Sequence, residues 1–228
     1  MKKLIVLTLI LASCFVNAQT KTELQKHYEA YYKQMKTQGD MQGIINSLTH
    51  LNIIAPSQAR KDTLAYLYMS ANKYNQALNT IGIDSSPSDS NLAVEVKAVS
   101  LKSLNQPERS LVHFKEMHKR KPTAFVAYEL AELSMQVKNL PEAVKYINYG
   151  LENVKDDMKK AFYETKQPYQ VSLKAAFIYL KGLAKYNENN TENLDAAIAI
   201  FDQALKLEPN FNLAQLSKEA LQAQKKQP

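Results

Sequence analysis

The sequence predicts an all-α protein, a right-handed α-solenoid of about five helix-turn-helix repeats that ends in a C-terminal capping helix. Small residues recur at one constant interval in two series: Ala65, Ala98 and Ala131, then Ala77, Ser110 and Ala143. A fixed period of this length indicates stacked helix pairs rather than one globular core. Apolar residues follow helical spacing, and 5 Gly and 8 Pro in 228 residues leave few turns for hairpins. We therefore expect no β-sheet in the mature chain.

Residues 1–18 are expected to be a secretory signal peptide. Lys2 and Lys3 give a basic start, the stretch from Leu4 to Val16 is almost wholly apolar, and Ala18 is a small residue that suits a signal peptidase. Residues 19–24 are expected to be a short linker. This pattern predicts an exported bacterial protein, periplasmic or secreted. We expect no transmembrane span in the mature chain, because no second apolar run is long enough to form a spanning helix.

Cys14, the single cysteine, lies inside this signal and has two interpretations. The sequence Leu11-Ala12-Ser13-Cys14 resembles the lipobox of bacterial lipoproteins, in which the cysteine becomes the lipidated first residue. Alternatively, cleavage follows Ala18, because the apolar run continues through Val16. In that case the mature chain has no cysteine and no disulfide.

The solenoid is expected to occupy residues 25–211. Each repeat consists of a helix, a short polar turn and an antiparallel partner helix. The expected repeats cover residues 25–57, 58–90, 91–123, 124–157 and 175–211. Residues 158–174 interrupt the period, either as an extended helix and connector or as a protruding element that shapes a binding site. Residues 212–228 are expected to form a capping helix and tail, with Leu213, Leu216 and Leu221 on one face.

This pattern resembles that of tetratricopeptide repeats. That family places small residues where the two helices of a repeat cross, with bulky residues around them, and Leu64-Ala65, Ala77 and Ile81 fit one repeat. The segment from Phe201 to Pro209 matches the end of a repeat well. The resemblance implies a curved stack in which the first helix of each pair lines a concave groove.

Family positions 2, 5, 9 and 12 of that first helix face the groove, and the resemblance transfers them to particular residues of this chain. The groove is then basic near its N-terminal end and aromatic toward its C-terminal end, which suits peptide recognition. The candidate groove residues are Lys33, Lys36, Tyr66, Met69, Val99, Lys102, Tyr128, Glu132, Met135, Tyr179, Leu183 and Tyr186. The carboxylate-clamp subtype of the family is not expected, because position 9 carries no Asn.

Catalytic and metal-binding signatures are absent from the sequence. No glycine-rich phosphate loop and no His-Glu-x-x-His motif occurs, and His113 and His118 are five residues apart, on different faces of one helix. We expect no catalytic residues, no metal and no cofactor. The net charge of +7 is modest and its lysines are scattered, so nucleic acid is not an expected partner.

These observations predict a non-catalytic interaction scaffold of the bacterial envelope that binds a peptide or protein segment in its concave groove. The alternative is a structural subunit of a membrane-associated complex, anchored through a lipid on Cys14. The identity of the protein partner does not follow from the sequence.

Overall fold

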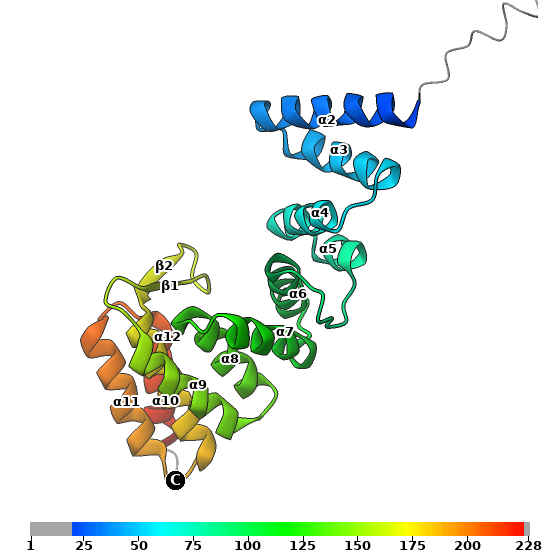
Figure 1. The fold of residues 1–228 in the computed structure, drawn as a ribbon. Helices are drawn as coiled ribbons and strands as arrows, with labels where there is room; N and C mark the ends of the chain where they lie inside the picture. Colours follow the sequence, from blue (N-terminus) through cyan, green and yellow to red (C-terminus); the bar gives the residue numbers. More distant parts are fainter. Residues whose placement is uncertain (1–19, 226–228) are drawn as a thin grey trace, which may run out of the picture.

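The structure is a computed structural model that describes residues 20–225. This part of the chain contains eleven helices and one two-stranded sheet (Figure 1). The signal peptide and Cys14 lie outside the described residues. The first four helix pairs are α2 (Lys21–Gln38) with α3 (Met41–Ile54), α4 (Gln58–Ser70) with α5 (Tyr74–Ile81), α6 (Asn91–Ser103) with α7 (Pro107–Arg120), and α8 (Ala124–Gln136) with α9 (Leu140–Asn153). Strands β1 (Lys159–Phe162) and β2 (Tyr169–Ser172) follow, and then helices α10 (Leu173–Glu188), α11 (Leu194–Leu207) and α12 (Asn212–Lys225).

Consecutive helices pack as pairs, and each pair packs against the next. In Figure 1, helices α2–α5 stack at one end, the chain bends near α6 and α7, and α8–α12 gather with the hairpin into a broader lobe. This arrangement confirms the predicted solenoid of helix pairs. Two boundaries differ from expectation. Residues 21–24 form the first turn of α2 rather than a linker, and α10 begins at Leu173, directly after β2.

The recurring small residues lie where the helices of a pair cross. Ala65, Ala98 and Ala131 on the first helices are completely buried, as are the small residues that face them on the second helices. In the third pair, the Ser110 hydroxyl donates a hydrogen bond of 2.8 Å to the Ala98 carbonyl oxygen on the facing helix. Slim side chains permit this close approach, and a larger one would force the helices apart.

The turns inside the helix pairs repeat with the same period as the small residues. They are centred on Gly39, Asn72, Asn105 and Lys138, and each of these residues has a left-handed backbone with φ between 55° and 69°. In each turn, the amide of the next residue donates to a carbonyl five residues back, as Asn139 does to Ser134 at 2.8 Å. Glycine and asparagine tolerate this conformation, whereas lysine is strained there.

Lys138→Gly is therefore expected to raise the free energy of unfolding by about 0.5–1 kcal/mol, because glycine adopts a positive φ without steric cost. Denaturant unfolding followed by circular dichroism measures the change. Lys138→Ala is the control, since alanine removes the charge without relieving the strain. An equal gain in both variants would show that the charge, not the backbone, was responsible.

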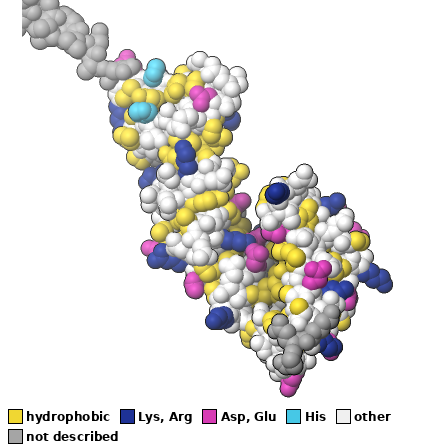
Figure 2. Space-filling model, turned by 180° about the vertical axis from the view of Figure 1, so that it is seen from behind, with side chains coloured by type: hydrophobic (Ala, Val, Ile, Leu, Met, Phe, Trp, Pro, Cys, Tyr) yellow, Lys and Arg dark blue, Asp and Glu magenta, His cyan; other side chains and the backbone are white. Residues whose placement is uncertain are grey.

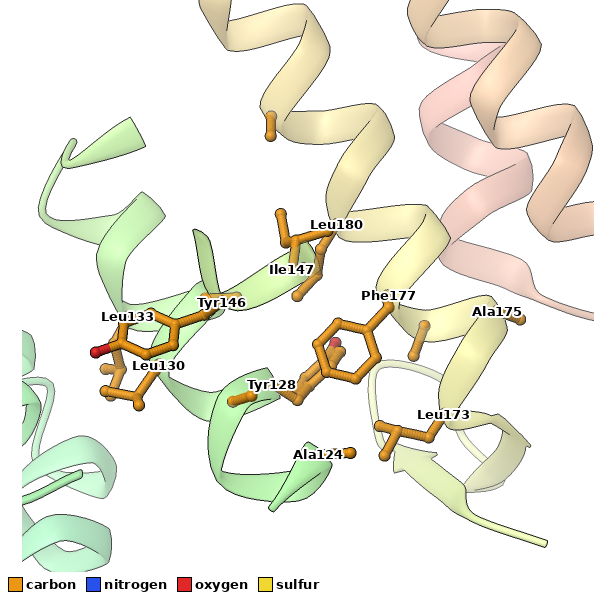
Figure 3. Close-up of a cluster of buried hydrophobic side chains, with 14 of the residues drawn as sticks. Ala124, Tyr128, Leu130, Leu133, Tyr146, Ile147, Leu173, Ala175, Phe177 and Leu180 are labelled. Carbon is orange, nitrogen blue, oxygen red and sulfur yellow. The ribbon is translucent and has the colours of Figure 1, made fainter. Parts of the chain in front are cut away.

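The apolar core is unevenly distributed along the solenoid. One large cluster extends from Ala98 on α6 to Ala214 on α12, and a small one joins α11 to α12, whereas the first two helix pairs have only small clusters, one of which reaches Val96 on α6. Figure 3 shows part of the large cluster, where the Phe177 ring of α10 lies beside Tyr128 of α8. Their ring centroids are 5.5 Å apart in an edge-to-face arrangement.

The expectation of no β-sheet is wrong for residues 159–172. Strands β1 and β2 pair antiparallel, with Phe162 opposite Tyr169 and Lys160 opposite Val171. Directly opposite residues share a face of the sheet, and Phe162 and Val171 are buried in the large cluster. The segment that interrupts the helical period is thus a hairpin packed onto the solenoid.

None of the described helices, α2 to α12, is both long enough and apolar enough to cross a membrane.

A buried polar network holds the loop between α5 and α6. The ammonium of Lys97, which is 2% exposed, donates to the Asp84 carbonyl oxygen at 2.8 Å and to the Asp89 carboxylate at 2.7 Å. On α7, the Nε2 atom of His113 lies 2.8 Å from the carbonyl oxygen of Ile83. Since that oxygen only accepts, Nε2 carries the proton. The buried Nδ1 atom has no hydrogen-bond partner among the described residues.

Mild acid is expected to destabilise this loop. Burial lowers the pKa of His113, the nearby Lys97 cation lowers it further, and the Ile83 carbonyl, Asp89 and Asp84 only partly oppose them. The unfolded chain takes up the proton near the ordinary histidine pKa of about 6.5, whereas the folded chain resists it, so stability falls as the pH drops from about 7.5 to 5.5. Denaturant unfolding at several pH values should show a smaller loss for His113→Gln, whose amide can still donate to Ile83. His27→Gln, on the exposed side of α2, is the control and should behave like the parent.

Candidate functional site

The candidate site is an open cavity of about 330 Å³ lined by α8, the hairpin, α10 and α12. In Figure 2, hydrophobic side chains gather in a hollow of the broader lobe, with side chains of both charges around it. Most of the lining is apolar or aromatic, and the remaining groups are one carboxylate and two amides. The lining residues are Tyr128, Glu132, Met135, Gln136, Phe162, Tyr179, Leu180, Leu183, Asn187 and Leu213.

Helical spacing places several of the predicted groove residues in this one cavity. Tyr128, Glu132 and Met135 are spaced by four and three residues along α8, so they share one face of that helix. Tyr179 lies on α10, one residue before Leu180, and Leu183 follows one turn later. The facing sides of α8 and α10 therefore form two walls of the cavity.

Tyr128 does not serve as the accessible anchor that the resemblance implies. Its side chain is 1% exposed, because the Lys160 ammonium of β1 lies 4.7 Å from its ring centroid and Phe177 packs against its edge. Burial raises the pKa of its phenol well above the usual range, so the hydroxyl stays protonated. Replacing Tyr128 by Ala would damage the core, and is unsuitable as a test of partner binding.

The basic character expected for Lys102 is cancelled by two neighbours. Its ammonium, on α6, forms ion pairs with the carboxylates of Glu129 and Glu132 on α8. Lys160 from the hairpin pairs with Glu129 at 2.7 Å. Burial alone would raise the pKa of Glu129, but Lys102 and Lys160 lower it. Burial likewise opposes the ammonium of Lys102, yet Glu129 and Glu132 raise its pKa. The ion pairs therefore favour the charged forms of Glu129 and Lys102, and the two lysines and two glutamates of this set carry equal and opposite formal charges.

The two predicted tyrosines on α10 both contact the capping helix. The Tyr186 hydroxyl donates to the Gln224 side-chain oxygen at 3.0 Å, and the Tyr179 hydroxyl accepts from Ser217 at 3.4 Å. Tyr186 lines a smaller hollow between α10 and α12 rather than the main cavity. Helix α12 thus occupies part of the surface that these side chains would otherwise offer.

The predicted residues of the N-terminal half do not join this cavity. Lys33 and Lys36 lie exposed on α2, and Tyr66 is exposed on α4. Met69 is partly buried against a small separate core cluster. The structure therefore places the predicted basic end and the predicted aromatic end of the groove on different helix pairs.

Sequence reasoning missed the walls that come from outside the repeats. Phe162 belongs to the hairpin, where its ring stacks with Tyr169 and contacts Phe211. Leu213 is on α12, and its amide donates to the Tyr169 hydroxyl at 3.4 Å. The aromatic residues of the interrupting segment were the available signal. The rim amides Gln136 and Asn187 gave none.

A second cavity of about 400 Å³ continues from the first. Met135, Gln136 and Asn187 line both, and Lys138 and Leu140 complete the second. The combined surface therefore runs from the hairpin and α12, past Met135, to the turn between α8 and α9.

Comparisons with known proteins define the class of this fold. The structure is similar to that of YrrB, described as a TPR protein with an unusual peptide-binding site, with a TM-score of 0.64 and 14% identity over 84% of this chain and 90% of that one. It is also similar to the MamA protein, with a TM-score of 0.60 and 15% identity over 82% of this chain and 93% of that one. The chain thus has the fold of a tetratricopeptide-repeat solenoid. No family model matches the sequence, and neither does any curated protein.

Proposed function

We propose that the protein is a non-catalytic interaction scaffold that binds a peptide or protein segment in the cavity between α8, the hairpin, α10 and α12. The observation that carries the proposal is the convergence of apolar side chains from four elements on one open hollow. A concave apolar surface with a few polar groups at its rim is the usual form of a binding site. The similarity of the fold to YrrB, whose description names a peptide-binding site, supports the same conclusion.

The site favours anchoring by a bulky apolar side chain. Its volume lies at the lower end of the range for ligand cavities, which suits one or two side chains rather than a folded surface. Met135 supplies a flexible wall that adapts to the shape of a bound group, and Tyr179 supplies a rigid one. Binding energy would be concentrated in this anchor, as in most interfaces.

The test is selection of binders from a displayed library of short random peptides, followed by affinity measurement with a selected peptide. Met135→Arg places a long charged side chain at the mouth of the cavity and is expected to weaken binding by about tenfold or more, a loss of roughly 1.4 kcal/mol. Met69→Arg is the matched control, because Met69 has the same place in its repeat two repeats earlier and does not line the cavity. Circular dichroism checks that both variants keep their helices. Equal affinities for the two variants would rule out this cavity as the site.

The predicted secretory signal adds a location to this proposal. Residues 1–18 support export, so the partner would be a protein of the bacterial envelope or its surroundings. The lipobox-like sequence before Cys14 favours a second candidate, a lipid-anchored structural subunit of a membrane-associated complex. Mass spectrometry of the purified N-terminus separates the two. A chain that starts at Gln19 supports the free scaffold, and a diacylated Cys14 supports the anchored subunit.

A further inference from the structure

The charges along the two joined cavities indicate which kind of peptide the site prefers. This inference rests on the proposed function. Of the described residues that line these cavities, Glu132 and Lys138 are charged. The Glu132 carboxylate is engaged by Lys102, which in turn belongs to the balanced set with Glu129 and Lys160. Near the hairpin, a bound cation would compete with Lys102, and a bound anion would meet Glu132. That end of the surface therefore suits an uncharged apolar side chain.

The other end of the surface carries an uncompensated positive charge. Lys138 is exposed and forms no ion pair with any residue in the range 20–225. It lines the second cavity together with Met135 and Leu140. A carboxylate on a bound segment would find here a cation that no carboxylate within residues 20–225 already pairs with.

The backbone at Lys138 gives an independent reason to assign it a role in binding. The three equivalent turns use Gly39, Asn72 and Asn105, residues that accept a left-handed backbone readily. Lysine at the fourth turn gives up stability that asparagine would retain. Local backbone strain of this kind clusters at functional sites, where a residue is retained because its side chain is needed for binding or catalysis.

We propose that the preferred partner segment carries a bulky uncharged side chain, which enters the cavity beside Phe162 and Leu213, and a carboxylate farther along that pairs with Lys138. The intervening peptide backbone lies along Met135, where the rim amides of Gln136 and Asn187 offer hydrogen bonds. The anchor supplies most of the affinity, and the carboxylate supplies selectivity.

The test compares a selected peptide that contains Asp or Glu with its Asn or Gln counterpart. With the parent protein, neutralising the acid is expected to weaken binding by about twofold to fivefold, the range of an exposed ion pair, and high salt should remove most of the difference. With Lys138→Asn, which keeps the turn chemistry of Asn72 and Asn105, the two peptides should bind alike. Lys174→Asn, an exposed change of equal charge on α10, should keep the parent's preference.

The possible outcomes distinguish failure of this inference from failure of the proposed binding function. Selected peptides without an acid preference, or a preference that survives in Lys138→Asn, would overturn the role of Lys138. In either case Met135→Arg would still weaken binding, and the proposed function would stand. Loss of the preference in Lys138→Asn alone supports the inference. A library that yields no binders, or binders indifferent to Met135→Arg, would remove both proposals.

Discussion

Replacing Phe177 by Ala is expected to lower the free energy of unfolding by about 3–5 kcal/mol, the usual cost of deleting a buried aromatic ring. The ring is completely buried in the large cluster, where it packs edge-to-face with Tyr128 (Figure 3). It also fills the space beside Gly150 that a side chain there would need. Removing the ring leaves a cavity next to Gly150. Because Gly150 has no side chain, it cannot fill any of that cavity. Urea unfolding followed by circular dichroism measures the loss.

Phe125→Ala serves as the control for this prediction. Its ring is 45% exposed at the start of α8, so its removal is expected to cost well under half as much. Similar losses for the two variants would mean that Phe177 does not hold α8, α9 and α10 together.

Gly150→Ala is expected to destabilise the protein by about 1–3 kcal/mol, even though alanine is favoured over glycine by about 1 kcal/mol inside a helix. A Cβ atom built on Gly150 would lie 2.0 Å from the nearest atom of the Phe177 ring. That ring is buried on all sides, so α9 and α10 must separate to admit even one methyl group. Thermal and urea unfolding measure the effect.

A second change on the facing helix tests the cause. Phe177→Leu shortens the side chain that meets residue 150, so the double variant should lose less than the sum of the two single losses. Asn148→Ala, exposed on the same helix, is the control and should change stability by less than about 0.5 kcal/mol. Strict additivity would show that the two residues do not meet as described.

The helix pairs could be predicted because their geometry is recorded locally. A crossing between two helices needs a small residue on each, so the repeat of Ala65, Ala98 and Ala131 marks the first helix of three pairs. The polar turns are marked in the same way by Asn72 and Asn105. Lys138 stands at the same step of the repeat, but only the structure shows that it adopts the left-handed backbone of Gly39, Asn72 and Asn105.

The hairpin could not be predicted, because its stability depends on distant residues. Strand β1, Lys159–Phe162, shows no clear alternation of polar and apolar residues. What holds the hairpin lies far along the chain: the Ser172 amide donates to Glu208, and the Leu213 amide donates to Tyr169. Tertiary contacts of this kind override weak local preference.

The candidate site could be predicted only in part, because it too depends on contacts between residues that are distant in the sequence. The resemblance to tetratricopeptide repeats, transferred by the phase of the repeat, assigned Tyr128, Glu132, Met135 and Tyr179 to one face of the stack. It did not reveal that Lys160 covers Tyr128, or that Glu129 and Glu132 neutralise Lys102, since those contacts join residues far apart in the sequence. A sequence pattern can assign a side chain to a surface. It does not show which distant parts of the chain cover that side chain in the fold.

Because the apolar core is uneven, the N-terminal end of the solenoid is expected to be less stable than the C-terminal lobe. Each repeat contacts only its neighbours. The pairs α2–α3 and α4–α5, which have only small apolar clusters, should therefore unfold locally with a lower free energy than the lobe from α6 to α12. A pulling force applied at the α2 end would then peel these two pairs away while the lobe with the cavity stayed folded. If the N-terminus is anchored and the lobe binds a partner, as proposed above, these four helices would form an extensible connection between the anchor and the partner.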